Sequence, residues 1–235
     1  MRPPAYQILA DDLRAQITSG RLRPGDRLPT EPQLCARTGV SRSTVREALR
    51  LLASQHLIVT TRGVTGGSFV AHPSTDMLAD TLTTGVRLLL RTAIVSAADL
   101  LEVREMLEVP AAGLAAVRRD GTQLAAMAAA LFDPERDDLD TILAAHRAFH
   151  LALAASTGNG LFEAITLPLY SVANERELVT QHPIDLWVRV DAEHREILAA
   201  IAAGDPEAAR AAAAGHLAHL RDRVTASAED RSPLG

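Results

Sequence analysis

Apolar residues in the first part of the chain recur at helical spacing, and polar capping residues interrupt them. The pattern predicts one helix over residues 6–19 and a second one starting at Thr30. Gln33 lies three residues after Thr30, which is the spacing of a capping box. Gly39 ends this second helix, and Ser41 caps a third. Two helices joined by so tight a turn predict a helix-turn-helix.

Two short β-prone segments follow the third helix. They cover residues 57–62 and 68–71, and the glycine-rich stretch 63–67 separates them. This arrangement predicts a hairpin, so the first domain is expected to be a winged helix-turn-helix over residues 1–72.

From residue 76 onward the apolar spacing is helical throughout, with short turns that contain Gly, Pro, Asn or Asp. The predicted helices cover approximately residues 76–91, 97–119, 122–131, 138–156, 160–180, 184–203 and 205–226. Without any strand signal, the natural packing is an antiparallel bundle of six or seven helices. The predicted fold is therefore mainly α, with this bundle forming a second domain over residues 73–235.

Charge divides the chain at the same place. Residues 1–72 hold ten arginines against five acidic residues, whereas the remainder holds fourteen against twenty-four, and lysine is absent. A basic first domain followed by an acidic second domain predicts that only the first domain binds a polyanion.

The sequence also bears on where the protein works. It contains no apolar run long enough for a membrane span, and its first residues carry charges where a signal peptide needs an apolar stretch. The single cysteine, Cys35, fits a reducing compartment and is expected to be a small core residue. These features predict a cytoplasmic protein.

The outward face of the third helix carries Arg42, Ser43 and Arg46. Arginine can donate to guanine O6 and N7, and both arginine and serine can hold a phosphate. Arg62 lies beside the glycines of the wing and is expected to touch the minor groove or the phosphates. The alternative is a solvated charged face, but the paired capped helices, the wing and the local charge together favour DNA binding.

The segment LPTEPQLCARTGVSRSTVREALRLLASQHLI, followed by GGSFV, strongly resembles the GntR family of bacterial regulators across roughly residues 5–72. The resemblance implies that Arg42 and Arg46 contact DNA, helped by Ser43, Thr44 and Gly66. One position that often carries arginine in this family is Pro32 here, so a phosphate contact made there by relatives is in doubt.

Four of the eight histidines lie on apolar helical stripes. His146 and His150 are one turn apart on one predicted helix, and His194 and His216 lie on the inward stripes of two others. A single inward histidine is usually a satisfied core residue. Four that converge from three helices favour a divalent metal, because each buried ring nitrogen without a partner costs on the order of 1–3 kcal/mol. His56, His72, His182 and His219 lack such a stripe and are expected to be surface or linker residues.

Residues 76–226 resemble the FCD ligand domain of the FadR subgroup of the same family. The matching pieces are LLEVREMLEVPAAGLAA, HRAFHLALAASTGN and EHREILAAIAAGDPEAARAAAAGHL. In metal-binding members the position of His146 is usually aspartate, and three histidines match His150, His194 and His216. Replacing the carboxylate by a fourth imidazole favours Zn, Ni or Co over Mn.

Relatives place a small organic acid on the open side of the metal. The resemblance nominates Arg104 as the partner of that acid's carboxylate. The alternative is a structural ion pair between Arg104 and Glu108, one turn later.

Together these features predict a ligand-responsive transcription regulator, with a repressor favoured, that binds a palindromic operator as a homodimer and responds to a small carboxylate. In one alternative, the metal itself is the signal. In another, the bundle is a metal-dependent enzyme with Glu193 as a base, but adjacent helical positions face different ways and no nucleophile stands out. The protein is therefore expected not to be an enzyme.

Overall fold

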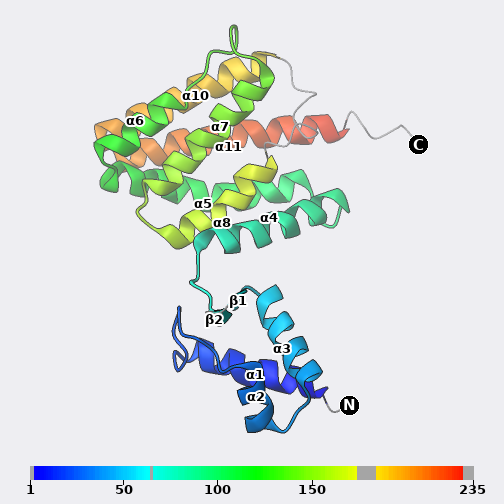
Figure 1. The fold of residues 1–235 in the computed structure, drawn as a ribbon. Coiled ribbons are helices and arrows are strands. Elements are labelled where there is room, and N and C mark those ends of the chain that lie inside the picture. The colour runs from blue at the N-terminus through cyan, green and yellow to red at the C-terminus, as the bar shows by residue number, and fades with distance from the viewer. Residues whose placement is uncertain (1–2, 64–65, 174–183, 230–235) are drawn as a thin grey trace, which may run out of the picture. The chain divides into compact units, whose positions relative to one another are not determined.

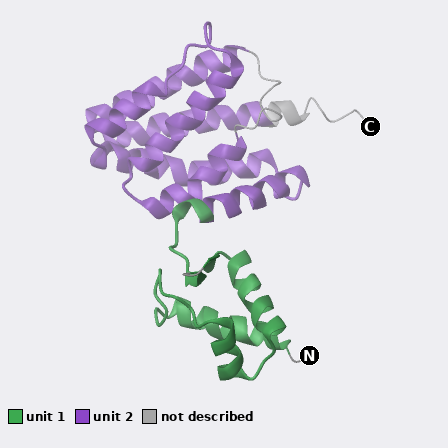
Figure 2. Cartoon of the chain, viewed as in Figure 1, with its two compact units in different colours: residues 1–77 green, residues 78–235 purple. Residues whose placement is uncertain are grey.

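The computed structural model describes residues 3–63, 66–173 and 184–229 and divides into two compact units, residues 1–77 and 78–235 (Figures 1 and 2). The predicted mainly α fold, a winged helix-turn-helix followed by a helical bundle, is confirmed. The domain boundary after residue 72 stays a prediction, because contacts alone divide the chain five residues later.

The first unit contains three helices, and the second and third begin at the predicted capping residues. The three are α1 (Ala5–Thr18), α2 (Glu31–Thr38) and α3 (Arg42–Ser54). The backbone N–H of Thr30 donates to the Gln33 side chain at 2.8 Å. Gly39 has a φ of 72°, a left-handed conformation that ends α2 at little steric cost. Ser41 Oγ accepts from the backbone N–H of Thr44 at 3.2 Å and so starts α3.

The wing is a two-stranded antiparallel hairpin of β1 (Ile58–Thr61) and β2 (Gly67–Val70), in which Ile58 lies opposite Val70. The sequence did not predict that residues 25–28 would lie along the free edge of β2. There the backbone N–H of Leu28 donates to the carbonyl of Ser68 at 2.8 Å. This extra pairing ties the wing to the segment that precedes α2.

The core of the first unit comes from the inward stripes of its helices together with one end of the hairpin. Its buried members are Leu9, Ala10, Leu13, Leu28, Leu34, Val45, Ala48, Leu52, Ile58 and Val70, with Cys35 partly buried against them. Because the apolar side of α3 is used in this core, its polar side is left on the surface.

Seven helices follow the wing in the described residues. They are α4 (Thr75–Arg91), α5 (Ala97–Arg118), α6 (Gly121–Ala129), α7 (Leu139–Ala155), α8 (Gly160–Ala173), α10 (Ile184–Ala203) and α11 (Pro206–Glu229). All of them lie in the second unit except the first three residues of α4. Their bounds agree with the predicted helices to within a few residues, except that the predicted end of the helix at 160–180 lies outside the described residues, as does His182. None of the described helices combines the length and the apolar character that crossing a bilayer requires.

The most extensive contact between two described helices of the bundle is the one between α5 and α11 (Figure 1). Alanines such as Ala112, Ala115 and Ala209 fill the space between the helices. Gly113 on α5 lies directly under the Arg210 side chain of α11, in space that a β-carbon would have to share. Small side chains therefore allow these two helices to pack closely at these positions.

Candidate functional site

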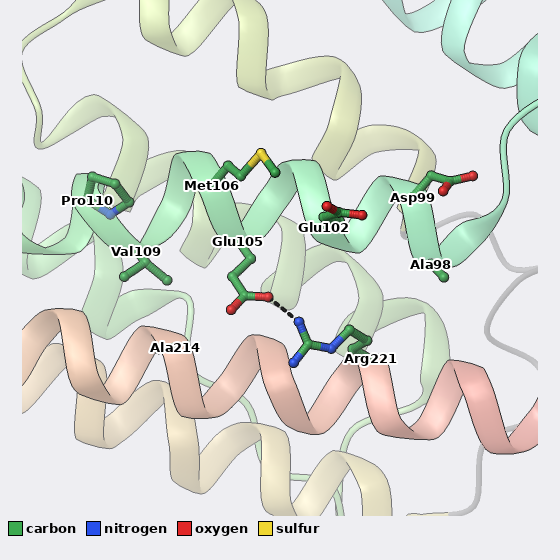
Figure 3. Close-up of a pocket in the computed structure, with 9 residues that line it drawn as sticks. All are labelled: Ala98, Asp99, Glu102, Glu105, Met106, Val109, Pro110, Ala214 and Arg221. Atoms are coloured by element: carbon green, nitrogen blue, oxygen red, sulfur yellow. Dashed lines mark hydrogen bonds and ion pairs between the residues drawn. The ribbon is translucent and has the colours of Figure 1, made fainter.

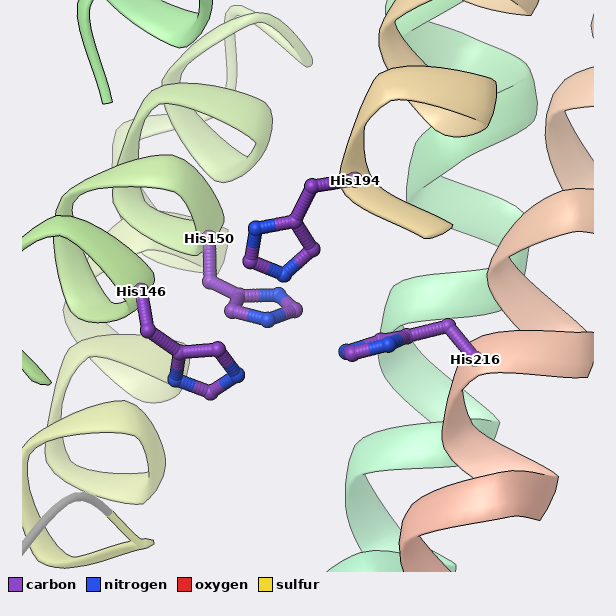
Figure 4. Close-up of side chains that lie close together, drawn as sticks. All are labelled: His146, His150, His194 and His216. Carbon is purple, nitrogen blue, oxygen red and sulfur yellow. The ribbon is translucent and has the colours of Figure 1, made fainter. Parts of the chain in front are cut away.

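Four histidine rings meet in the interior of the bundle (Figure 4). Helix α7 supplies His146 and His150 from successive turns, α10 supplies His194, and α11 supplies His216. All four are buried, and one nitrogen from each ring lies within 4.8 Å of the other three. We call these residues the histidine cluster.

One carboxylate from α5 binds both a ring of the cluster and a buried arginine. Glu108 Oε2 lies 2.7 Å from His150 Nδ1, and Glu108 Oε1 accepts from Arg104 Nε at 2.5 Å. Arg104 and Glu108 are 2% and 3% exposed, so the pair lies inside the protein. The structural ion pair considered as the alternative for Arg104 is therefore present, and it lies against the histidine cluster.

A second carboxylate contacts the cluster from α10. Glu193 Oε2 lies 2.9 Å from His216 Nδ1, and Glu193 Oε1 lies 3.1 Å from His219 Nδ1. Arg189 Nε donates to Glu193 at 2.9 Å from the solvent side. The prediction that His219 is an ordinary surface or linker residue is wrong, because its ring is largely buried against Glu193, one turn of α11 beyond His216.

Burial and the neighbouring charges fix the protonation states at the cluster. Burial lowers the pKa of His150 to about 4, although Glu108 opposes this. Burial and the other rings lower the pKa of His194 well below its usual value. Burial alone would raise the pKa of Glu108, but Arg104 and His150 lower it to about 2. At neutral pH, His150 and His194 are therefore neutral and Glu108 is ionised.

The nitrogens of the cluster fit a metal ion. Within the described residues, neither ring nitrogen of His194 has a hydrogen-bond partner, and neither does Nε2 of His216, although all three are buried. Such groups are costly unless something binds them. Neutral imidazoles are good ligands for zinc, nickel and cobalt, and neither His150 nor His194 needs to lose a proton first.

The predicted DNA-reading residues lie on the surface of the first unit. Arg42, Ser43 and Arg46 are exposed along α3, and Thr44 is half-buried beside them. Arg46 does not extend freely, because its Nε donates to Glu31 on α2 at 3.0 Å. Sequence reasoning missed this contact, because nothing in the spacing of residues 31 and 46 indicates that they meet.

The other two predicted DNA contacts are in the wing. Arg62 is exposed just after β1. At Gly66 a β-carbon would lie 2.6 Å from the carbonyl oxygen of Thr61, so only glycine fits this tight turn. The carbonyl of Gly66 accepts from Arg27 at 2.6 Å, which makes Arg27 a support of the wing that the sequence did not reveal.

A separate groove of about 580 Å³ runs between α5 and α11 (Figure 3). Its lining includes the acidic side chains Asp99, Glu102 and Glu105, and Arg221 pairs with Glu105 at 2.5 Å. None of the four histidines lines it. The groove is therefore distinct from the histidine cluster.

Comparison with known proteins matches two separate parts of the chain to two family models. Residues 5–70 match the family model for bacterial regulatory proteins of the gntR family, and residues 99–219 match the FCD domain. The HTH-type transcriptional regulator LutR of Bacillus subtilis (strain 168) is 32% identical, over 91% of this chain and 98% of its own length. The putative L-lactate dehydrogenase operon regulatory protein of Escherichia coli (strain K12) is 29% identical, over 95% of this chain and 88% of its own length.

A solved structure shares the fold over almost the whole chain. The protein described as Streptococcus agalactiae GntR superposes with a TM-score of 0.58 at 25% identity and covers 93% of this chain and 99% of its own. These relatives are named as regulators of transcription, not as enzymes.

Proposed function

Because this chain belongs to the gntR family of bacterial regulatory proteins and carries an FCD domain, it is a DNA-binding transcription regulator and not an enzyme, and we propose that it responds to a small organic acid held at a divalent metal ion. The observation that carries the proposal is the histidine cluster, with its buried nitrogens that lack hydrogen-bond partners within the described residues. Zinc and nickel suit these four ligands best. The protein is expected to act as a repressor that binds a palindromic operator.

In the proposed complex, α3 lies in the major groove. Arg42 and Arg46 read base edges or hold phosphates, and Ser43 and Thr44 bind the backbone near the start of the helix. The wing, through Arg62 and the backbone at Gly66, contacts the flanking groove. The exposure of Arg42, Ser43, Arg46 and Arg62 supports this arrangement.

Arg46→Ala is expected to weaken operator binding by about 5-fold to 150-fold, because a well-placed arginine contributes about 1–3 kcal/mol of discrimination between bases. Arg136→Ala is the matched control, since Arg136 is also an exposed arginine paired with a nearby carboxylate but lies in the bundle. Fluorescence anisotropy with an operator selected from random DNA, at one fixed salt concentration, measures both. Equal affinity of Arg46→Ala and the control would contradict the proposed reading face.

The effector is proposed to bind beside the metal, with its carboxylate on Arg104. Only the Nε of Arg104 donates to Glu108 at short range, and Nη2 lies 3.4 Å from His150 Nε2, next to the cluster. Since the Escherichia coli relative is named for a lactate dehydrogenase operon, L-lactate and other 2-hydroxy acids are the first candidates. The metal would supply a Lewis-acidic position for such an acid.

The proposal is tested by native mass spectrometry with metal analysis, followed by operator titrations with zinc alone and with zinc plus an acid. A change in operator affinity only when the acid is present supports the proposed sensor. A change with zinc alone supports the alternative, in which the metal itself is the signal. No bound metal after purification and no zinc or nickel binding on addition would overturn both.

A homodimer is proposed because a palindromic operator mirrors a two-fold axis of the protein. An exposed apolar stripe on α5 supports this and suits a second copy. Met106 and Leu114 each lie four residues from Pro110, while Val103 and Val117 each lie seven residues from it. A stripe that is symmetric about its centre can pack antiparallel against itself, as a two-fold interface requires.

Met106→Glu is expected to shift the protein from dimer toward monomer by at least about tenfold in dissociation constant, because it places a charge in the middle of the proposed interface. Leu161→Glu is the control, since Leu161 is similarly exposed, at 61% against 64% for Met106, but lies on α8. Analytical ultracentrifugation over a concentration series measures both. Equal dimer dissociation constants for Met106→Glu and Leu161→Glu would rule out the exposed face of α5 as the dimer interface.

A further inference from the structure

We infer that Glu108 and Glu193 are positioning residues that orient two rings of the histidine cluster, and that Glu108 also links the metal to the effector arginine. The inference rests on the proposed metal site. It assigns roles to two carboxylates that would not touch the metal themselves.

A histidine ring presents one nitrogen to a metal only if the other nitrogen carries the hydrogen. At His150 the carboxylate of Glu108 lies 2.7 Å from Nδ1. An ionised carboxylate can only accept and repels a ring lone pair, so its closeness favours the hydrogen on Nδ1, even though the N–H does not point straight at the oxygen. The lone pair is left on Nε2, and this ring is held in the orientation that a ligand needs.

The same arrangement recurs at His216 from a different helix. Glu193 Oε2 lies 2.9 Å from Nδ1 of His216, and Nε2 of this ring is buried without a hydrogen-bond partner within the described residues. Two independent elements, α5 and α10, thus hold two rings by the same nitrogen. A metal ligand whose distal N–H donates to a carboxylate is a recurrent arrangement that raises the basicity of the ligand.

The two carboxylates differ in what else they bind. Glu193 is shared with the largely buried His219 and with the exposed Arg189. Glu108 is fully buried and is shared with Arg104, at 2.5 Å from its Nε. One carboxylate therefore contacts both a proposed metal ligand, through Oε2, and the proposed effector arginine, through Oε1 and more distantly through Oε2. Only Glu108 is placed to couple metal affinity with acid affinity.

The test measures zinc affinity by competition with a chromophoric chelator, using the full-length protein. Glu193→Ala and Glu108→Ala are each expected to lower zinc affinity by about 10-fold to 100-fold, the usual effect of losing such a partner. Glu105→Ala is the matched control, because Glu105 is a bundle carboxylate paired with Arg221 and away from the cluster. Variants that bind zinc as tightly as this control would overturn the inference.

The coupling between metal affinity and acid affinity is tested by titrating L-lactate into each variant at saturating zinc and measuring its affinity. Glu108→Ala is expected to lower lactate affinity by at least about tenfold, because Arg104 loses the carboxylate that holds its side chain in place. Glu193→Ala is expected to leave lactate affinity within about twofold. Equal effects of the two variants would overturn the distinction between the two carboxylates.

A second measurement needs no variant, in case Glu108→Ala does not fold. Nitrogen-15 NMR of the imidazole rings in the wild-type protein reports which nitrogen carries hydrogen. His150 and His216 are expected to be protonated at Nδ1 without metal and to bind zinc through Nε2. Protonation at Nε2 in the metal-free protein would overturn the inference, whereas a normal Nδ1–H pattern with no zinc binding would overturn only the proposed function.

Discussion

His194→Leu is expected to make the metal-free protein more stable and at the same time to remove its metal binding. The His194 ring is fully buried and stacks on Phe149 at 4.1 Å between ring centroids. Both of its nitrogens lack a hydrogen-bond partner within the described residues, and each such atom costs about 1–3 kcal/mol. Leucine fills similar space without polar atoms, so the unfolding free energy should rise by about 1–3 kcal/mol.

The same substitution should reduce zinc affinity by more than about 100-fold, because losing a direct ligand must exceed the effect of losing an outer partner. Urea unfolding and chelator competition measure the two effects on one preparation. His72→Ala is the control, since His72 is exposed in the first unit. A His194→Leu protein that is less stable than wild type and still binds zinc would show that His194 is only a packed core residue.

Acid is expected to destabilise the metal-free protein between pH 6.5 and about 4. Burial lowers the pKa of His150 to about 4 from the ordinary 6.5, and burial likewise lowers the pKa of His194. In this range the unfolded chain binds protons that the folded protein excludes, so unfolding takes up protons and stability falls as the pH falls. The lowered pKa of His150 alone corresponds to a loss of about 3 kcal/mol in the free energy of unfolding once the pH has fallen through this range.

The measurement is urea unfolding of the metal-free protein at several pH values. The interval from pH 6.5 to 5 is the most informative, because ordinary carboxylates are still ionised there. Glu108 adds a loss of stability at lower pH, where the unfolded chain protonates a carboxylate whose folded pKa is about 2. His194→Leu should show a smaller pH dependence than wild type. A stability that stays constant from pH 6.5 to 5 would contradict neutral buried rings.

Periodicity was sufficient to predict most of the fold. The caps at Thr30 and Ser41 are local chemistry, and the turn glycine Gly39 has the left-handed conformation expected of it. The stripes that carry the four histidines depend only on the 3.6-residue repeat of each helix. Because each stripe must face the core, the sequence predicted that the rings point inward before any packing was known.

Contacts between elements could not be predicted in this way. Glu193 does turn away from His194, as adjacent helical positions must, yet it reaches His216 on α11. The pairing of Arg46 with Glu31 and the contact of Arg27 with the wing likewise join residues whose spacing carries no signal. His219 was misjudged for the same reason, since its partner lies on another helix. Periodicity gives the direction of a side chain, whereas its partner depends on how the helices pack.

The contact of Gly113 with the Arg210 side chain has a mechanical consequence. With no β-carbon at Gly113, α5 and α11 pack closely at this point of their contact. Helix α5 carries Arg104 and Glu108, and α11 carries His216. Because α5 and α11 share an extensive contact, an acid that binds Arg104 is expected to displace α5 and α11 together.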